Sequence, residues 1–228
     1  MKQDNSLAST RGAQSTPKRV CIVGISGKLG QYMARHALDK GYEVVGVCRA
    51  KSVDKLTEFG DRITLVPGAT SDRAVIERAV AGCDAVLTVL VPWGVRNYSS
   101  GTAKAVIDFA PADARLIFSS GWHVRSSDAD RYSRRFLTMI AIVSWLAKLV
   151  RAVDIADQER AAQLIFDSGT DWTLVRGSDL EEGESEGLPV WSAHVGDAIL
   201  RSNLTRRTDF ALFMVDAITN DGLIGQAP

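Results

Sequence analysis

Short, continuous runs of apolar residues recur along the chain, and segments with helical spacing of apolar residues separate them. Continuous apolar runs are typical of parallel strands that are buried on both faces. The runs predict strands at 19–24, 43–48, 63–66, 84–91, 115–119 and 171–176. Apolar residues that recur at helical spacing predict helices at 28–40, 71–80, 98–109, 157–167 and 206–218.

The alternation of strands and helices predicts βαβ units, and therefore an α/β fold with a doubly wound parallel sheet of the Rossmann type. We expect a single domain over residues 18–228, with a small C-terminal elaboration on the substrate side. Residues 1–17 have almost no large apolar side chains, so we expect a disordered leader there. Towards the C-terminus we expect 181–187 to be a solvated acidic loop and 223–224 to begin a short edge strand.

Charge and cysteine content narrow the functional classes. The 228 residues include 27 Lys and Arg and 27 Asp and Glu, so the formal net charge is zero. A neutral chain exerts no broad electrostatic attraction on nucleic acid or on an anionic membrane surface. Three cysteines cannot all pair, and Cys21 and Cys48 lie in predicted strands as buried thiols, which indicates a reducing, cytoplasmic location. The three histidines lie far apart in the sequence, so we expect no metal site.

The longest apolar run covers residues 136–150 and includes Lys148. It is short for a helix that crosses a bilayer, so we expect no stable membrane insertion. Arginines flank the run, and an interfacial amphipathic helix is one interpretation. The interpretation that we favour is a helix buried against the core or against the second subunit of a homodimer.

Three glycines, Gly24, Gly27 and Gly30, stand between the first predicted strand and the first predicted helix. A glycine-rich turn at a helix N-terminus lets backbone N–H groups approach a phosphate closely. The spacing is G-x-x-G-x-x-G, and in this position it predicts a loop that binds dinucleotide phosphates. We expect three further residues of the loop to contact the cofactor: Ser26, Lys28 and Leu29. The alternative is a tight turn that binds nothing.

The end of the second predicted strand indicates which dinucleotide binds. An acidic residue at this place would bind the ribose hydroxyls of NAD. Arg49 follows the strand instead, and no Asp or Glu stands there. A guanidinium suits a 2′-phosphate because it forms paired, charge-assisted hydrogen bonds. The sequence therefore predicts NADP(H) as the cofactor. Lys28, inside the glycine loop, either reaches the same phosphate or is a solvated lysine at the start of the helix.

With these motifs in place, residues 19–218 resemble the atypical short-chain dehydrogenases, in particular the NmrA-like and biliverdin-reductase-B or flavin-reductase proteins. The most specific segment is 168–176 (SGTDWTLVR), although Gly177 stands where the family has proline. The other carriers are the glycine loop, Arg49, residues 68–72 (GATSD), residues 82–84 (GCD) and the pair Ser119 and Ser120.

The resemblance implies further cofactor contacts. The family has Gly-Asp after its third strand, and Ala69 replaces that acid here, which removes any carboxylate role at that place. The neighbouring residues that would lie at the edge of the adenine are Thr70, Ser71 and Asp72. We also expect Ser71 to cap the helix that follows, with Asp72 in its first turn. At the ends of later strands, the remaining expected contacts are Leu90, Val91, Ser119 and Arg176.

Candidate catalytic residues follow the fifth predicted strand. Ligands in open α/β sheets bind beyond the carboxyl ends of the strands, so Ser119 and Ser120 are expected beside the nicotinamide. In short-chain dehydrogenases a serine here binds the carbonyl, a tyrosine about 13 residues later donates the proton, and a lysine lowers the tyrosine pKa. Tyr132 has that spacing, but Phe136 replaces the lysine. His123 is the competing proton donor, because an unperturbed histidine titrates near neutral pH. The alternative is a loop histidine that takes no part in the chemistry.

Three functions remain open on these residues. The first is an NADPH-dependent reductase that transfers hydride to a small, apolar or conjugated carbonyl or flavin-like acceptor, for which Trp93 and Trp122 would supply aromatic walls. The second is an NmrA-like regulator that binds NADP(H) without turnover, which the missing lysine favours. The third is a cyclase or isomerase on the same fold, because a fold does not decide function. We favour the reductase.

Overall fold

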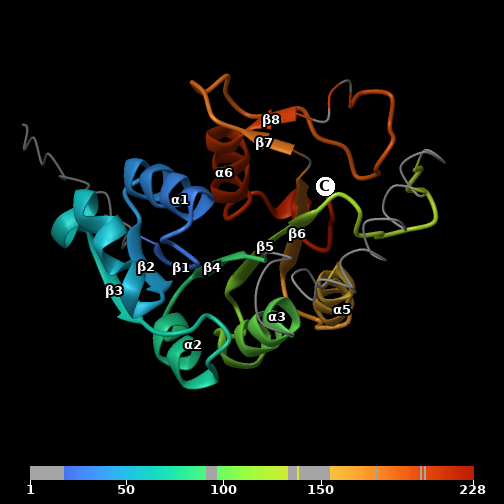
Figure 1. Ribbon diagram of the computed structural model, residues 1–228. Coiled ribbons are helices and arrows are strands. Elements are labelled where there is room, and N and C mark those ends of the chain that lie inside the picture. Colours follow the sequence, from blue (N-terminus) through green and yellow to red (C-terminus); the bar gives the residue numbers. More distant parts are fainter. Residues whose placement is uncertain are drawn as a thin grey trace, which may run out of the picture.

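Six parallel strands form the main sheet in the computed structural model, which describes residues 18–90, 97–132, 138, 155–177, 179–200, 202 and 204–228 (Figure 1). The strands of this sheet are β1 (Arg19–Val23), β2 (Glu43–Cys48), β3 (Ile63–Pro67), β4 (Ala85–Val89), β5 (Arg115–Gly121) and β6 (Trp172–Gly177). Their order in the sheet is β3-β2-β1-β4-β5-β6. The order reverses between β1 and β4, and in doubly wound sheets this is the place where ligands bind.

Helices cover both faces of this sheet (Figure 1). The described α-helices are α1 (Lys28–Asp39), α2 (Arg73–Val80), α3 (Tyr98–Phe109), α5 (Ile155–Phe166) and α6 (Arg207–Asp216). Two 3₁₀ segments, η1 (Ala50–Arg62) and η2 (Asp221–Leu223), complete the helical elements. α1 and α6 pack together on one face, whereas α2, α3 and α5 pack on the other.

The alternation of side chains along β1 shows why its sequence is apolar from Val20 to Val23. Val20 and Ile22 join the core under α1 and α6, whereas Cys21 and Val23 join the core under α2, α3 and α5. A strand covered on both faces has no solvent side, so it needs no polar positions. The prediction of a doubly wound parallel sheet is confirmed. The predicted burial of Cys21 and Cys48 is confirmed as well, and both thiols are free.

Several local predictions were wrong, among them the strand at 84–91, which as β4 covers only Ala85–Val89. The N-cap of α2 is Asp72 and not Ser71, because the Asp72 carboxylate accepts a hydrogen bond of 3.0 Å from the Ala74 N–H. Residues 223–224 begin no strand: η2 ends there, and it is the following Gln226 that forms an isolated parallel bridge to Thr173 on β6. β5 continues through both serines to Gly121, because these residues pair with the end of β6.

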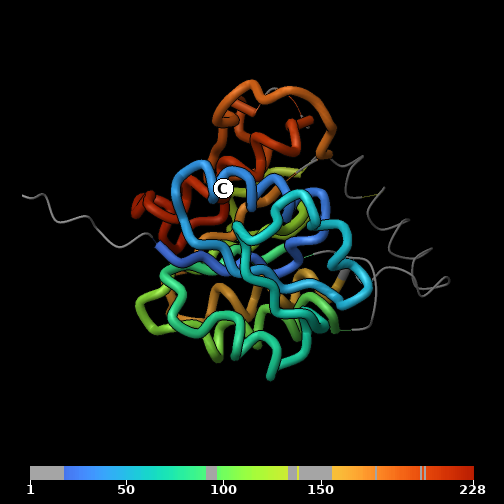
Figure 2. Tube along the Cα trace, turned by 90° about the vertical axis from the view of Figure 1, so that its left-hand side faces the viewer, coloured from blue at the N-terminus to red at the C-terminus, as the bar shows by residue number. Residues whose placement is uncertain are grey.

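A small parallel pair of strands, β7 (Asp179–Glu181) and β8 (Leu204–Arg206), stands outside the main sheet. It lies beside α6 at the top of the molecule (Figure 1), and the orange segment projects on the same side in the turned view (Figure 2). The β7–β8 pair belongs to the small C-terminal elaboration that the sequence predicts after the sixth strand. This elaboration brings residues 179–200 and 204–207 over the carboxyl ends of the strands, where they help to form the site.

Some predictions fall on residues that the structure does not describe. These are the leader at 1–17, Val91, Trp93, and the apolar run 136–150 apart from Thr138. Within the described ranges, no helix combines the length and the apolar character that a membrane crossing requires.

Candidate cofactor and substrate site

The phosphate loop uses each of its glycines differently. Gly24 has φ +92°, a backbone conformation that favours glycine, and its N–H donates to Val47 O on β2 at 2.9 Å. A Cβ on Gly30 would stand 2.4 Å from Gly24 O, so glycine is needed there for α1 to pack against the loop. Gly27 has an ordinary φ of −75°, and a Cβ there would meet only Gly24 O at 3.4 Å. The fold therefore does not require glycine at Gly27, and the open space beside it fits a bound phosphate.

Lys28 is paired within the protein. Its ammonium lies 3.1 Å from the Glu182 carboxylate, which also accepts hydrogen bonds from Tyr32 at 3.1 Å and from Arg207 at 2.9 Å. Hydrogen bonds from Arg207 and then Lys28 lower the pKa of Glu182 to about 2. The acidic loop at 181–187 is thus a bridge between the phosphate loop and α6, and not only a solvated connection. Arg207 is a second cation at this place, which the sequence analysis missed because it is distant in the chain.

A cleft of about 560 Å³ extends from the phosphate loop to the ends of β4, β5 and β6. It brings together seven residues that the sequence predicted: Gly27, Lys28, Leu29, Leu90, Ser119, Ser120 and His123. It also contains residues that the sequence analysis did not single out, among them Gln158 and Arg207. The cleft therefore joins a phosphate-binding end to a polar end, as a dinucleotide site requires.

Buried polar atoms at the polar end lack partners among the described residues. Ser119 Oγ accepts a weak hydrogen bond from the Leu90 N–H at 3.3 Å, whereas Ser120 Oγ and His123 Nε2 have no partner there. Unsatisfied buried groups are rare and require an explanation, and a ligand that supplies the missing hydrogen bonds is one. Burial also lowers the pKa of His123, so its imidazole is neutral at pH 7. This weakens the expectation that His123 acts as a proton donor.

Tyr132, the predicted proton donor, is engaged with the backbone. Its hydroxyl donates to Trp122 O at 3.0 Å and lies 3.3 Å from Val124 O, and the side chain is not part of the cleft. Burial raises the pKa of Tyr132, which makes the phenol a weaker acid. These contacts hold the turn after β5, and they argue against direct catalysis by Tyr132.

Arg176 is likewise engaged inside the protein. Its guanidinium forms a buried ion pair with Asp130 at 2.8 Å and donates to Ala227 O at 2.7 Å and Ala193 O at 2.9 Å. The side chain is only 1% exposed. The described contacts therefore assign Arg176 to the support of the site, and they argue against its predicted contact with the cofactor.

The residues predicted to contact the adenine half lie at the ends of β2 and β3. Arg49 is exposed at the start of η1 and forms no ion pair with any described residue. Thr70 is buried and donates to the Tyr98 hydroxyl. Ser71 and Asp72 are exposed, and Asp72 caps α2. None of these four residues lines the cleft itself, so their contacts with a cofactor stay predictions, as does that of Ser26.

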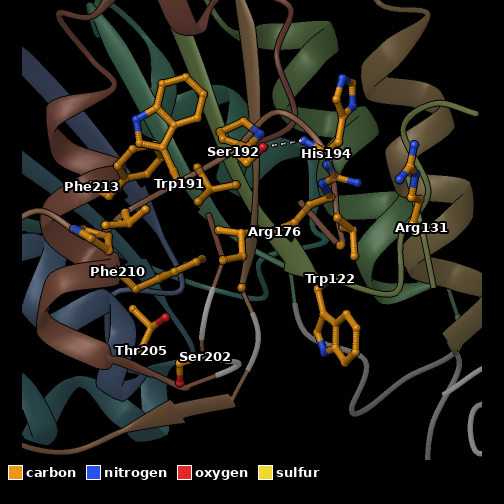
Figure 3. Close-up of a pocket in the computed structure, with 18 residues that line it drawn as sticks. Trp122, Arg131, Arg176, Trp191, Ser192, His194, Ser202, Thr205, Phe210 and Phe213 are labelled. Carbon is orange, nitrogen blue, oxygen red and sulfur yellow. Dashed lines mark hydrogen bonds between the residues drawn. The ribbon is translucent and has the colours of Figure 1, made fainter. Parts of the chain in front are cut away.

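A second cavity of about 320 Å³ adjoins the cleft, because Trp122, Gly177 and Phe210 line both. Figure 3 shows Trp191 close to Phe213 on one side, with ring centroids 6.1 Å apart, and Trp122 across the cavity. The remaining wall comes mainly from residues 189–200 together with Ser202 and Thr205. The cavity is thus an aromatic chamber beside the polar end of the cleft. Within the described ranges, no group of His, Cys, Asp and Glu is arranged to hold a metal ion.

Comparison with known proteins gives this site a context. A family model described as NAD(P)H-binding matches residues 24–221. A (4-alkanoyl-5-oxo-2,5-dihydrofuran-3-yl)methyl phosphate reductase from Streptomyces griseus subsp. griseus is 26% identical over 218 residues, which cover 91% of this chain and 66% of the relative. The chain spans between 24% and 66% of the length of the curated relatives that it matches.

Solved structures share the fold at low sequence identity. A short-chain dehydrogenase/reductase from Veillonella parvula in complex with NADP superposes with a TM-score of 0.62 at 14% identity, with 93% of each chain covered. An anaerobillin reductase from Escherichia coli O157:H7 has a TM-score of 0.62 at 19% identity, with 89% of this chain and 91% of that chain covered.

Proposed function

The chain belongs to the NAD(P)H-binding family, and on that premise we propose that it is an NADPH-dependent oxidoreductase of the atypical short-chain dehydrogenase type. Its acceptor is a small, apolar or conjugated molecule of carbonyl or flavin-like type. One observation carries the proposal: a single cleft joins the phosphate loop to a group of buried polar atoms without partners. A curated relative at 26% identity that is named a reductase supports reduction as the chemistry.

Charge supports NADP(H) over NAD(H). Arg49 follows β2 with no described ion-pair partner, so its guanidinium is available to a 2′-phosphate. The phosphate loop begins beside it, because Gly24 and Ile25 both donate to Val47 O on β2. Lys28 and Arg207 supply further positive charge where the pyrophosphate would bind.

The polar end of the cleft orients the acceptor. The hydride would come from the nicotinamide when the cofactor is bound, and the reduced acceptor must gain one proton as well. The unpartnered Ser120 Oγ supports a role as hydrogen-bond donor to the acceptor oxygen, and neutral His123 would contribute a hydrogen bond from its ring and not a full proton. The proton would then come from water, which leaves a hydroxide ion to the solvent. The adjoining aromatic chamber, with Trp122 between it and the cleft, suits a flat apolar body.

Cofactor titration tests the proposal first. We expect NADPH to bind the wild type at least about tenfold more tightly than NADH, since a charge-assisted hydrogen bond contributes about 1.5–3 kcal/mol. Arg49→Ala should remove this preference and leave NADH binding unchanged. Arg78→Ala, which removes an exposed arginine on α2, is the matched control and should bind both cofactors as the wild type does. Equal affinities in the wild type would contradict the choice of NADP(H).

Turnover separates the reductase from a regulator that binds NADP(H) without reaction. The engagement of the Tyr132 hydroxyl with backbone oxygens favours the regulator. NADPH oxidation should be followed with menadione, flavin mononucleotide and an aromatic aldehyde as acceptors. A reductase oxidises NADPH with at least one of them, and Ser120→Ala slows the reaction about 10²-fold or more without loss of NADPH affinity. Tight NADPH binding with no oxidation by any acceptor would favour the regulator.

A further inference from the structure

The Gln158 side chain on α5 is only half satisfied. The residue is 2% exposed, and its amide Nε2 donates to Leu90 O at 3.0 Å. Its Oε1 atom is buried and has no hydrogen-bond partner in the described part of the chain. The bond to Leu90 fixes which way the amide is turned, because the reverse orientation would set two carbonyl oxygens against each other. The carbonyl oxygen is therefore held in place in the wall of the cleft, 3.6 Å from where a Cβ on Gly121 would stand.

The helix that carries this amide is firmly anchored. The neighbouring Asp157 carboxylate accepts a hydrogen bond of 2.6 Å from the Ser99 N–H at the start of α3. This contact ties α5 to α3, and both helices pack on the same face of the sheet. An amide on rigid support is preorganised for a ligand and does not have to be ordered when the ligand binds.

The missing partner must be a hydrogen-bond donor. A buried carbonyl oxygen without a partner lowers stability, and its presence in a native fold requires an explanation. The Gln158 oxygen only accepts, so the ligand group that faces it must carry an N–H or O–H. The reacting oxygen of a carbonyl acceptor is itself an acceptor and does not fit. The nicotinamide half of the cofactor fits, since its carboxamide and its ribose hydroxyls all donate.

The sheet order places Gln158 at the same half of the cofactor. The phosphate loop follows β1, Arg49 follows β2 on one side of it, and Leu90 follows β4 on the other. In doubly wound sheets a dinucleotide lies across the place where the strand order reverses, here between β1 and β4. With its 2′-phosphate at Arg49, its nicotinamide half would extend towards β4 and β5. Gln158 contacts the end of β4 through Leu90.

We propose that Gln158 is a cofactor-binding residue whose Oε1 accepts a hydrogen bond from the nicotinamide half of NADP(H). This inference rests on the proposed function, since it needs the dinucleotide in the cleft. Gln158 bears no charge and does not titrate, so it orients the nicotinamide half and takes no part in proton transfer.

Two ligands test the proposal by titration. NADPH contains the nicotinamide half, whereas 2′,5′-ADP contains the adenine, its ribose and two phosphates only. Gln158→Met should weaken NADPH binding about tenfold, as expected for one lost hydrogen bond, and should leave 2′,5′-ADP binding unchanged. The matched control is Gln163→Met on the same helix, which replaces an exposed glutamine bonded to Asp167 and should change neither affinity.

A second variant distinguishes the loss of one hydrogen bond from a folding defect. Gln158→Asn keeps an amide but withdraws it by one methylene, so it should show the same selective loss of NADPH affinity. Unchanged NADPH affinity in both variants overturns the inference alone, and so does an equal loss of both ligands in both variants, which is the mark of a structural role. A folded wild type that binds neither ligand overturns the proposed function and the inference with it.

Discussion

At the scale of single residues, the phosphate loop shows that one motif can combine different physical requirements. Gly24 needs its left-handed φ, and Gly30 needs space for the backbone of the loop. Gly27 needs neither, because its φ is ordinary and the space around its Cβ position is nearly open. A motif made only for a turn would not require glycine at Gly27, so this residue is the one whose substitution separates ligand binding from folding.

Alanine at Gly27 should therefore affect NADPH binding, whereas alanine at Gly30 should affect the stability of the fold. Gly27→Ala should leave the melting temperature close to that of the wild type and weaken NADPH binding about tenfold or more, since the methyl group occupies space that the pyrophosphate needs. Gly30→Ala should lower the free energy of unfolding by about 1–3 kcal/mol, because its Cβ would overlap the loop backbone. Thermal unfolding and NADPH titration measure both. Unchanged NADPH affinity in Gly27→Ala would mean that the loop is only a turn.

At the scale of elements, the start of α2 depends on which of two adjacent residues caps it. The Asp72 carboxylate accepts from the Ala74 N–H at 3.0 Å, whereas Ser71 is exposed and makes no described contact with the helix. Both residues are good N-caps by type, so sequence preference could not choose between them. The choice follows from the backbone, because the residue that caps is the last one with extended φ and ψ before the helix begins.

The two positions give a matched pair of variants. Asp72→Ala should lower the free energy of unfolding by about 1 kcal/mol, the usual effect of losing an N-cap. Ser71→Ala should change it by less than about 0.5 kcal/mol, as surface substitutions usually do. Urea unfolding measures both. A larger effect at Ser71 than at Asp72 would contradict the assignment of the cap.

At the scale of the whole molecule, the Arg176–Asp130 ion pair joins segments that are distant in the sequence. Arg176 lies on β6, and Asp130 follows the turn after β5 and also accepts from the Val195 N–H at 2.8 Å. The guanidinium also donates hydrogen bonds to Ala193 O and Ala227 O. This one buried side chain therefore joins four parts of the chain around the aromatic chamber: β6, the segment at Asp130, and the segments at Ala193 and Ala227. Removal of one partner from a buried ion pair leaves the other charge uncompensated, which is strongly destabilising.

The pair should make stability depend on pH in the acid range. Burial acts to raise the pKa of Asp130, but hydrogen bonds from Arg176 and from the backbone outweigh it and lower the pKa to about 2. The stabilisation is thus fully present above the unfolded pKa of about 3.9 and is lost as the pH falls through about 2. Asp130→Asn should lower the free energy of unfolding by about 3–5 kcal/mol at pH 7. This difference from the wild type should shrink as the pH falls from 5 to 2.

Chemical unfolding at a series of pH values measures that difference. Asp128→Asn is the control, because Asp128 lies on the same turn and is fully exposed, with Arg125 at 3.8 Å. It should unfold as the wild type does at each pH. A difference between Asp130→Asn and the wild type that stays constant down to pH 2 would show that the carboxylate charge is not what stabilises the fold.

The sequence by itself determined the sheet and the position of the glycine loop between its first strand and first helix. Continuous apolar runs such as 43–48 and 115–119 follow from burial on both faces, which is a requirement on each strand alone. The glycine loop and Arg49 are equally local, because each is defined by its position directly after a strand. Signals of this kind lie within a few consecutive residues, and a single sequence is enough to read them.

Only the tertiary structure decided which side chains meet at the polar end. Gln158 looks like any polar residue of an amphipathic helix until packing buries it beside Leu90, and Arg207 reaches Lys28 only through Glu182. Tyr132 has the expected spacing, yet the turn after β5 directs its hydroxyl to the backbone. Burial then sets the chemistry, since it lowers the pKa of His123. These outcomes depend on contacts between segments far apart in the chain, where spacing along the sequence carries no information about distance, solvation or charge.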